Sequence, residues 1–397
     1  MTAIAATLGG LTMLAGGVSG ALGATSTGVP VSTAGTTGAT GPTGASGTTG
    51  MSGPFAAGPV VASLNADVPI AAGGGWVVWS VPVSGGWALE GSHAGVARPL
   101  DVAPRPQPFD VNVGTTATGA PVVTFSRCTK TPTSAFFGEI APLSGSGCRI
   151  HVLNLKTLAE TVAAIPHPSG TSDTTPSMWH GRVAFGRLDP AHHQQVQQVM
   201  LWTPGHRTLR TLAHGAIPTD CPYQGGCAGM TRSGVVEGLS YDGRLVSFLW
   251  EPSAPGVIGD GGWEVRADNV ATGHSTLVSS GFAGEVCTGS EDLAAPSPPV
   301  LDGYTVSLVA LEADCYVFNS VFAQMKTTVG GNGTYANLPG ITLGVAEDGS
   351  TFYVVEAATP TDETDPTCTV AIPCQIQQIH QPAPLKPESR KPSSPFF

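Results

Sequence analysis

Residues 239–250 read LSYDGRLVSFLW, and this stretch decides the fold. Apolar and polar residues alternate on both sides of Asp242-Gly243. An Asp-Gly pair between two such runs is a strong hairpin signal, because short hairpin turns need residues that accept positive φ. The stretch therefore predicts two antiparallel strands joined by a tight turn.

Weaker versions of this pattern recur along the chain. In each, a glycine precedes an alternating or apolar run, and these glycines are Gly75, Gly119, Gly181, Gly243, Gly303 and Gly349. A second pair of short strands follows in most repeats, and four-stranded repeats of about 40–60 residues are typical of propeller blades. We therefore predict an all-β protein, a six-bladed β-propeller with four-stranded blades over residues 58–381. Residues 60–64 precede the first unit and are expected to pair into the last blade, because this covers an exposed edge and closes the ring.

Each repeat begins with a strand that leads into the motif Ser-x-Asp-Gly-x-x-Val-x-Phe. A further strand, a turn that contains Gly and a last strand follow. This pattern is similar to the TolB-type, WD40-like propeller repeat, best at 239–278 and partly at 173–212 and 341–381. The unit at 70–102 lacks the Asp, and the unit at 109–165 carries Thr-Gly instead. The resemblance implies the fold more than an activity, since the family includes binding modules, scaffold proteins and non-catalytic domains of peptidases. No α/β-hydrolase unit follows the propeller, so the peptidase form is not expected.

The flanking segments have distinct compositions. Residues 1–24 are apolar and end in small residues, which predicts a signal peptide, although a basic n-region is missing and a membrane anchor is the alternative. Residues 25–57 carry glycine at every third position from 35 to 53, the collagen pattern. Few prolines accompany these glycines, so a flexible linker is favoured over a triple helix and a monomer is expected. Residues 382–397 are predicted to be a disordered, Pro-rich tail.

The charge and the cysteines restrict partners and compartment. The net charge is −11, and no cluster of Lys and Arg opposes it, so nucleic acid is not an expected partner. Membrane insertion is not expected beyond a possible N-terminal anchor. The eight cysteines fall in neighbouring pairs, which predicts disulfides and an extracytoplasmic protein, secreted or at the cell surface. The predicted bridges are Cys128–Cys148, Cys221–Cys227, Cys287–Cys315 and Cys368–Cys374.

Candidate ligand residues are few. Glu237, Asp173 and Asp292 precede the turns, where the first strands line the channel, and acidic groups there are either solvated charges or ligands of Ca²⁺. Most aromatic side chains, Trp179 among them, fall on strand positions and are assigned to the core. Trp87 is the exception, because it follows Gly85-Gly86, and it is the candidate for ligand stacking.

These observations leave three classes of function. The first is an exported binding or scaffold module at the cell envelope, with an unknown protein or glycan ligand. The second is a secreted propeller enzyme, lactonase-like or a glycan-active hydrolase or lyase, with its site at the channel mouth. The third is a structural surface protein. No nucleophile-base pair, metal cluster or cofactor fingerprint emerges from the sequence, so we assign no catalytic residue, metal or cofactor and favour the first class over an enzyme.

Overall fold

The computed structural model describes residues 55–130, 146–189, 197–214, 233–253, 261–283, 292–293, 297–314, 317–326, 333–338, 341–357 and 368–380. The chain divides into two units, Met1–Thr49 and Gly50–Phe397, and every described residue belongs to the second. The predicted leader, most of the predicted linker and the predicted tail lie outside the described residues. All regular elements in the described ranges are strands. The prediction of an all-β protein is therefore confirmed for this part of the chain.

The hairpin predicted around Asp242 is present. Strand β14 (Ser233–Tyr241) pairs antiparallel with β15 (Leu245–Ser253). The Asp242 amide donates to the Leu245 carbonyl at 3.3 Å, so Gly243 is the first central turn residue, and it has a φ of 94°. Asp242 Oδ1 accepts the Leu245 amide at 2.8 Å. The Asp side chain thus satisfies the turn amide while the glycine supplies the positive φ.

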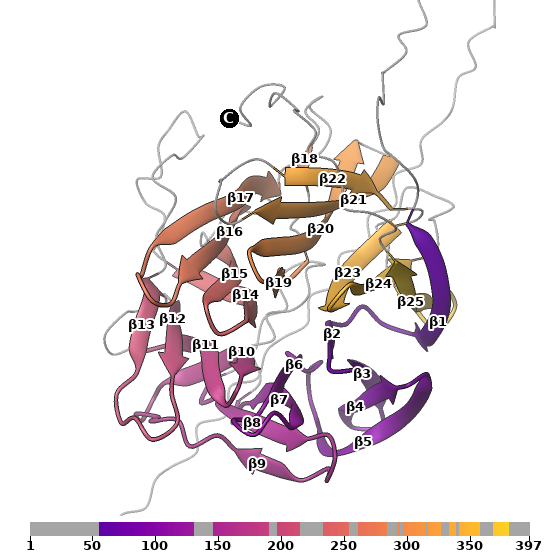
Figure 1. The fold of residues 1–397 in the computed structure, drawn as a ribbon. Coiled ribbons are helices and arrows are strands. Elements are labelled where there is room, and N and C mark those ends of the chain that lie inside the picture. Colours follow the sequence, from indigo (N-terminus) through magenta and orange to yellow (C-terminus); the bar gives the residue numbers. More distant parts are fainter. Residues whose placement is uncertain are drawn as a thin grey trace, which may run out of the picture. The chain divides into compact units, whose positions relative to one another are not determined.

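The described strands form six antiparallel sheets, which are arranged as blades around one axis (Figure 1). Four of these sheets contain four consecutive strands each. They are β2 (Ile70–Gly73), β3 (Trp76–Val83), β4 (Gly86–His93) and β5 (Val96–Arg105); β6 (Asn112–Thr115), β7 (Pro121–Arg127), β8 (Arg149–Asn154) and β9 (Glu160–Val162); β10 (Ser172–Trp179), β11 (Arg182–Leu188), β12 (Gln197–Trp202) and β13 (Arg210–His214); and β14 and β15 with β16 (Gly261–Asn269) and β17 (Ser275–Ala283).

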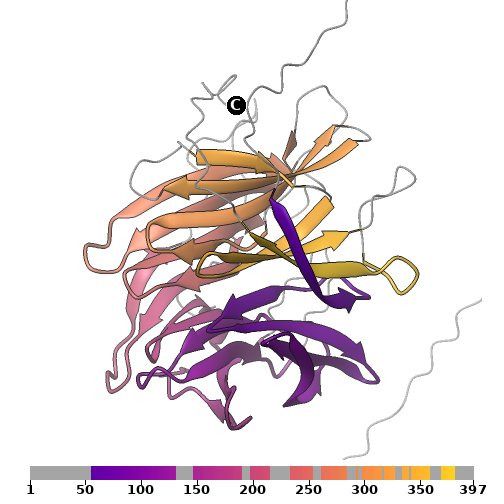
Figure 2. The ribbon, with the colours of Figure 1, turned by 45° about the vertical axis from the view of Figure 1, so that its right-hand side comes forward.

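A fifth four-stranded sheet joins the two ends of the propeller. Its order is β1-β25-β24-β23, with β1 (Ala56–Leu64) paired to β25 (Cys374–His380) and the inner strands β24 (Thr351–Ala357) and β23 (Ile341–Asp348) following. Figure 2 shows β1 lying beside β25. The predicted closure of the last blade by the N-terminal segment is confirmed.

The remaining sheet differs from the predicted pattern because it has five strands. Both β18 (Asp292–Leu293) and β19 (Val300–Asp302) pair with β20 (Thr305–Asp314), and β21 (Val317–Lys326) and β22 (Gly333–Asn337) follow. The residues before β19 include Pro298 and Pro299, which have no amide hydrogen to donate to a ladder. The inner strand is therefore interrupted.

The prediction of a β-propeller with four-stranded blades is therefore confirmed for five sheets, and the predicted count of six such blades is not. Five of the sheets have four strands, and the sheet of residues 292–337 departs from that pattern.

The core lies between neighbouring sheets. Trp76 and Leu89 pack in one buried cluster with Val123 and Phe125 of the next sheet, and the other buried clusters join their neighbours in the same way. One cluster joins the last sheet to the first, where Trp79 is 1% exposed. Each sheet therefore buries both faces only when its neighbours are present, which holds the inner strands at fixed positions around the axis.

Candidate functional site at the axial cavity

A cavity of about 370 Å³ lies along the axis of the propeller. The segments that line it run up to the first hairpin turn of each sheet, and they are residues 67–74, 110–115, 175–180, 237–242, 298–301 and 343–347. In Figure 1 the strands of these segments, β2, β6, β10, β14, β19 and β23, lie nearest the centre. One end of the cavity is therefore formed by the starts of these segments, and the other end is formed by the hairpin turns.

Side-chain oxygens bridge neighbouring inner segments. Ser177 Oγ accepts the Tyr241 amide at 3.0 Å, and Ser240 Oγ accepts the Leu301 amide at 3.1 Å. Inner strands of different sheets share no backbone ladder, so these hydroxyl groups satisfy amides that would otherwise be buried without a partner. These hydroxyl groups of the cavity wall therefore hold neighbouring sheets together.

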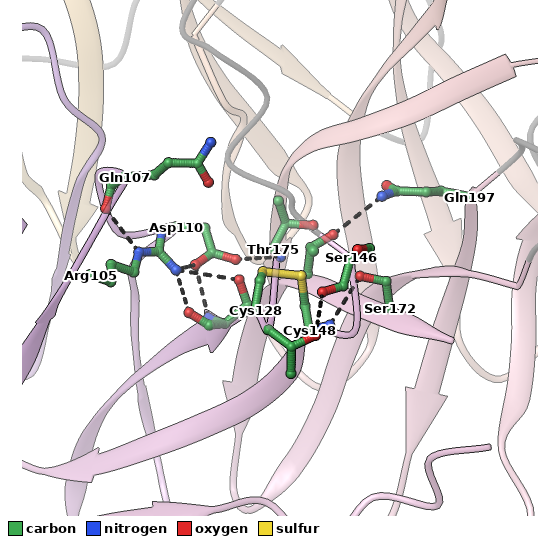
Figure 3. Close-up of a disulfide and its surroundings, with 12 residues drawn as sticks. Arg105, Gln107, Asp110, Cys128, Ser146, Cys148, Ser172, Thr175 and Gln197 are labelled. Atoms are coloured by element: carbon green, nitrogen blue, oxygen red, sulfur yellow. Dashed lines mark hydrogen bonds and ion pairs between the residues drawn. A yellow bond between two sulfur atoms is a disulfide. The ribbon is translucent and has the colours of Figure 1, made fainter. Parts of the chain in front are cut away.

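Asp110 also bonds to neighbouring sheets. Its Oδ1 accepts a hydrogen bond from Arg105 Nη1 at 3.1 Å and one from the Ser126 amide at 2.8 Å, and its Oδ2 accepts the Thr175 amide at 2.8 Å (Figure 3). Arg105 also donates to the carbonyl of Ser126. The Asp110 side chain is 1% exposed, so this pair joins three sheets at the edge of the cavity and leaves no open carboxylate.

A disulfide lies close to this ion pair. Cys128, directly after β7, is bonded to Cys148, directly before β8 (Figure 3). Cys368 and Cys374 are also bonded. Two of the four predicted bridges are therefore confirmed. The predicted pairs Cys221–Cys227 and Cys287–Cys315 lie outside the described residues.

Asp173, a predicted channel-mouth residue, is instead buried within its own sheet at 1% exposure. Arg187 lies directly opposite it on β11 and donates from Nε to Oδ1 at 2.6 Å and from Nη2 to Oδ2 at 2.7 Å. His167 Nδ1 lies 3.1 Å from Oδ2. The carboxylate is thus held by a bidentate pair, and Asp173 does not line the cavity.

The other three predicted ligand residues are dispersed. Glu237 lies in β14, is partly buried and lines the cavity. Asp292 is the first residue of β18 and pairs with Ala313 in the backbone ladder. Trp87 is partly buried against core clusters of the first sheet and does not line the cavity. Among the predicted ligand residues whose side chains the structure describes, Glu237 alone lines the cavity.

Trp179 lines the cavity at the hairpin-turn end, and sequence reasoning assigned it to the core. Its side chain is 38% exposed, whereas Trp76, Trp79 and Trp250 are at most 5% exposed. The ring lies against Gly243 of the next sheet, where an added Cβ would come within 2.4 Å of it. The indole is therefore backed by a turn that has no side chain.

The turn that carries Trp179 is anchored to a neighbouring sheet. His180 and Gly181 both have positive φ, 47° and 77°, as in a type I′ turn, which is uncommon for His. The His180 amide donates to Thr115 Oγ1 at 3.2 Å, and the Gly181 amide donates to the Thr115 carbonyl at 2.8 Å. The His180 and Trp179 rings lie 4.3 Å apart between centroids and nearly perpendicular. The exposed indole is thus held in a defined place.

Four carboxylates other than Asp110 line the cavity: Asp67, Glu237, Asp242 and Glu347. Burial and the nearby charge of Asp302 raise the pKa of Glu347 to about 8, although Ser307 partly offsets the effect. Burial raises the pKa of Asp67 to about 6. No Lys or Arg is among the described residues that line the cavity.

The cavity acids do not converge on one point. Within the described ranges, no three His, Cys, Asp or Glu side chains are grouped closely enough to hold a metal ion.

The same part of the chain contains no helix with the length and hydropathy needed to cross a membrane.

Comparison with models of protein families finds no match to this chain, and neither does comparison with curated proteins. Solved structures do match. A nidogen/laminin complex chain is 10% identical with a TM-score of 0.41, covering 71% of this chain and 86% of that one. A polysaccharide lyase, an ulvan lyase, is 9% identical with a TM-score of 0.44, covering 77% and 82%. An α-L-arabinanase of Penicillium chrysogenum is 10% identical with a TM-score of 0.42, covering 81% and 97%.

Proposed function

We propose that the protein is an exported binding module of the cell envelope, a six-bladed TolB-like propeller whose ligand occupies the axial cavity at its hairpin-turn end. The observation that carries this proposal is the cavity itself. It measures about 370 Å³, near the lower end of the range of about 300–1,000 Å³ for small-molecule sites. Its wall combines the exposed Trp179 with carboxylates and is built on a rigid ring.

The location and the partners follow from the same features. The bonded pairs Cys128–Cys148 and Cys368–Cys374 are consistent with an oxidising compartment outside the cytoplasm. The described residues that line the cavity include carboxylates and no Lys or Arg, which disfavours nucleic acid as a ligand. A small ligand, or the end of a glycan or peptide chain, fits the volume better than a folded protein surface does. We propose that the protein works as a monomer.

One observation favours a second candidate, a secreted glycan-active enzyme. The pKa of Glu347 is raised to about 8, so this carboxyl group is largely protonated at neutral pH. A protonated acid facing an ionised carboxylate is the pairing that glycoside hydrolysis requires. Asp242 is a second acidic residue of the same cavity wall, on a different sheet from Glu347.

Calorimetric titration of the full-length protein separates the two candidates. The probes are neutral oligosaccharides, penta-lysine and simple lactones, and each probe is recovered afterwards for mass spectrometry. A binding module takes up one of these classes saturably, returns it intact, and loses affinity in Glu237→Gln or Glu347→Gln. Turnover that disappears in Glu347→Gln would instead support the enzyme. Absence of saturable binding and of turnover with every class would count against both.

A further inference from the structure

Three consecutive hairpin turns carry planar side chains, and the first of them, with Trp179, lines the cavity. Trp179, at the end of β10, is 38% exposed, and Tyr304, in the turn between β19 and β20, is 45% exposed. Between them, Arg244 places its guanidinium carbon 3.8 Å from the centre of the Tyr304 ring and donates from Nη1 to the Tyr304 hydroxyl at 2.7 Å. These residues, with His180, form what we call the turn-face arc.

The arc is fixed rather than adaptable. Trp179 lies on Gly243, Arg244 is hydrogen-bonded to Tyr304, and the turn of His180 is anchored to Thr115. Trp179 and Tyr304 each expose part of an aromatic ring at a fixed position, and such a ring offers a surface on which a ligand can stack. A rigid platform also lowers the entropy lost on binding.

We propose that this mouth binds a neutral oligosaccharide, with one ring stacked on Trp179 and with hydroxyl groups of this ring and of others along the chain bonded to Asp242 and Glu347. This inference rests on the proposed binding function and names its ligand class.

The stacking partner follows from the shape and charge of the platform. A sugar ring presents axial C–H groups on an apolar face, and these groups are attracted to the negative face of an indole. Trp179 leaves part of its ring open because its support, Gly243, has no side chain. An aliphatic chain would bury the indole equally well, but it would leave the cavity carboxylates without partners.

The polar partners come from two other sheets of the cavity wall. Asp242 directly precedes Gly243, and its Oδ1 is occupied by the amides of Arg244 and Leu245, while Oδ2 accepts no hydrogen bond from the described residues. Glu347 lies near the end of β23, across the ring from β10 (Figure 1). Its Oε2 is buried and has no hydrogen-bond partner among the described residues. Carboxylate oxygens are good acceptors for sugar hydroxyl groups.

The charge of the lining selects among sugars. The described residues that line the cavity include carboxylates and no Lys or Arg, and Arg244 of the turn-face arc lies outside this lining with its Nη1 bonded to Tyr304. A sugar carboxylate or sulfate inside the cavity would therefore meet like charge. Uncharged rings meet no such penalty. The predicted ligand is therefore a neutral oligosaccharide and not an acidic one.

Titration calorimetry of the full-length protein tests the proposal. The probes are cellohexaose, xylohexaose, linear arabinohexaose, mannohexaose and chitohexaose, with hexagalacturonate as the acidic comparison. We expect one neutral probe to bind. Trp179→Ala should weaken that probe by at least about tenfold, which is about 1.4 kcal/mol, while Trp179→Phe should keep most of the affinity because a ring remains.

Matched controls distinguish stacking from damage to the fold. Trp87→Phe changes an indole outside the cavity and should leave affinity unchanged, and thermal unfolding of each variant verifies folding. No binding by any neutral probe up to about 1 mM, or hexagalacturonate binding as tightly, would overturn the proposal. Binding of penta-lysine that depends on Glu347 but not on Trp179 would overturn the sugar ligand while leaving the binding function intact.

Discussion

Buried carboxylates in this protein differ in how their charge is compensated. Asp110 and Asp173 are each almost fully buried and are each paired with an arginine, Arg105 and Arg187. Asp268, on β16, is 1% exposed and has no paired arginine at salt-bridge distance among the described residues. The first two therefore stabilise contacts between strands and sheets, whereas the third is a source of pH dependence.

Arg187→Met should destabilise the protein strongly, because it leaves Asp173 buried without its cation. Breaking a buried pair by removing one partner costs about 3–5 kcal/mol. Urea unfolding followed by tryptophan fluorescence measures the change. Arg266→Met is the matched control, since Arg266 is one-third exposed in its pair with Glu264, and exposed pairs contribute about 0–1 kcal/mol. Equal effects of the two changes would contradict the assignment of Asp173 to the fold.

Asp268 predicts the direction in which stability depends on pH. Burial raises its pKa from 3.8 to about 6, while Ser275, Arg266 and His274 lower it in part. The folded state therefore holds the proton more tightly than the unfolded state. The stabilisation is complete below about pH 4 and is lost as the pH rises through 6.

Asp268→Asn should remove this dependence. Unfolding free energies of the wild type should fall by up to about 2–3 kcal/mol between pH 4 and 7 from this residue, and the variant should lack that fall. Denaturation at a series of pH values measures the slope. Asp101→Asn, at an exposed position, is the control. An unchanged slope in Asp268→Asn would show that Asp268 titrates alike in both states.

At the scale of elements, the disulfides staple two different connections. Cys128–Cys148 spans a sequence separation of 20 between β7 and β8, and Cys368–Cys374 spans 6 before β25. Loop-closure entropy predicts that removing the first bridge costs about 3 kcal/mol and removing the second about 2 kcal/mol. Double Cys→Ser variants compared by thermal unfolding measure these costs. A larger loss from the shorter bridge would show that loop entropy does not govern them.

Strand β1 closes the ring, so its removal should unfold the last sheet. We expect deletion of residues 58–68 to lower the melting temperature sharply, because it exposes the edge of β25 and opens the cluster around Ile376. Differential scanning calorimetry measures the shift. Deletion of residues 1–49 is the control. An unchanged transition after loss of 58–68 would contradict closure.

Sequence periodicity predicted the hairpins, the four-stranded repeat and the closing strand because these depend on local turn chemistry and on alternation. The site was harder to predict. Asp173 was placed in the channel because it precedes a turn, yet its side chain faces Arg187, and neighbouring strand positions point to opposite faces. Trp179 was placed in the core because it ends a strand, and only the packing of the next sheet's Gly243 against it leaves it exposed.

The interruption of the inner strand before β19 could have been predicted from two prolines in the sequence. Pro298 and Pro299 stand where an uninterrupted first strand was expected. Prolines in a run argue against a continuous strand. Pro298 also lies against Gly238 of the preceding sheet, where an added Cβ would come within 2.3 Å of it. The interrupted strand therefore packs closely against the preceding sheet at a glycine, where a side chain would collide with Pro298.

At the scale of the whole molecule, the collagen-like residues 25–57 raise the question of oligomeric state. We expect a monomer, because the segment has too few prolines to stiffen a triple helix. Light scattering of the full-length protein measures the mass. A trimer that dissociates when residues 25–57 are removed would contradict this expectation.

The pairing of β1 with β25 also determines how the propeller responds to tension. Ala56 lies opposite His380, so the chain enters and leaves the propeller at the same end of one antiparallel pair. Hydrogen bonds in such a pair run perpendicular to the strands. A force that separates the two tails would load these bonds one after another, like a zipper, instead of shearing them together. Anchored by one tail and pulled by the other, the ring would open at this seam at low force, before any blade unfolds.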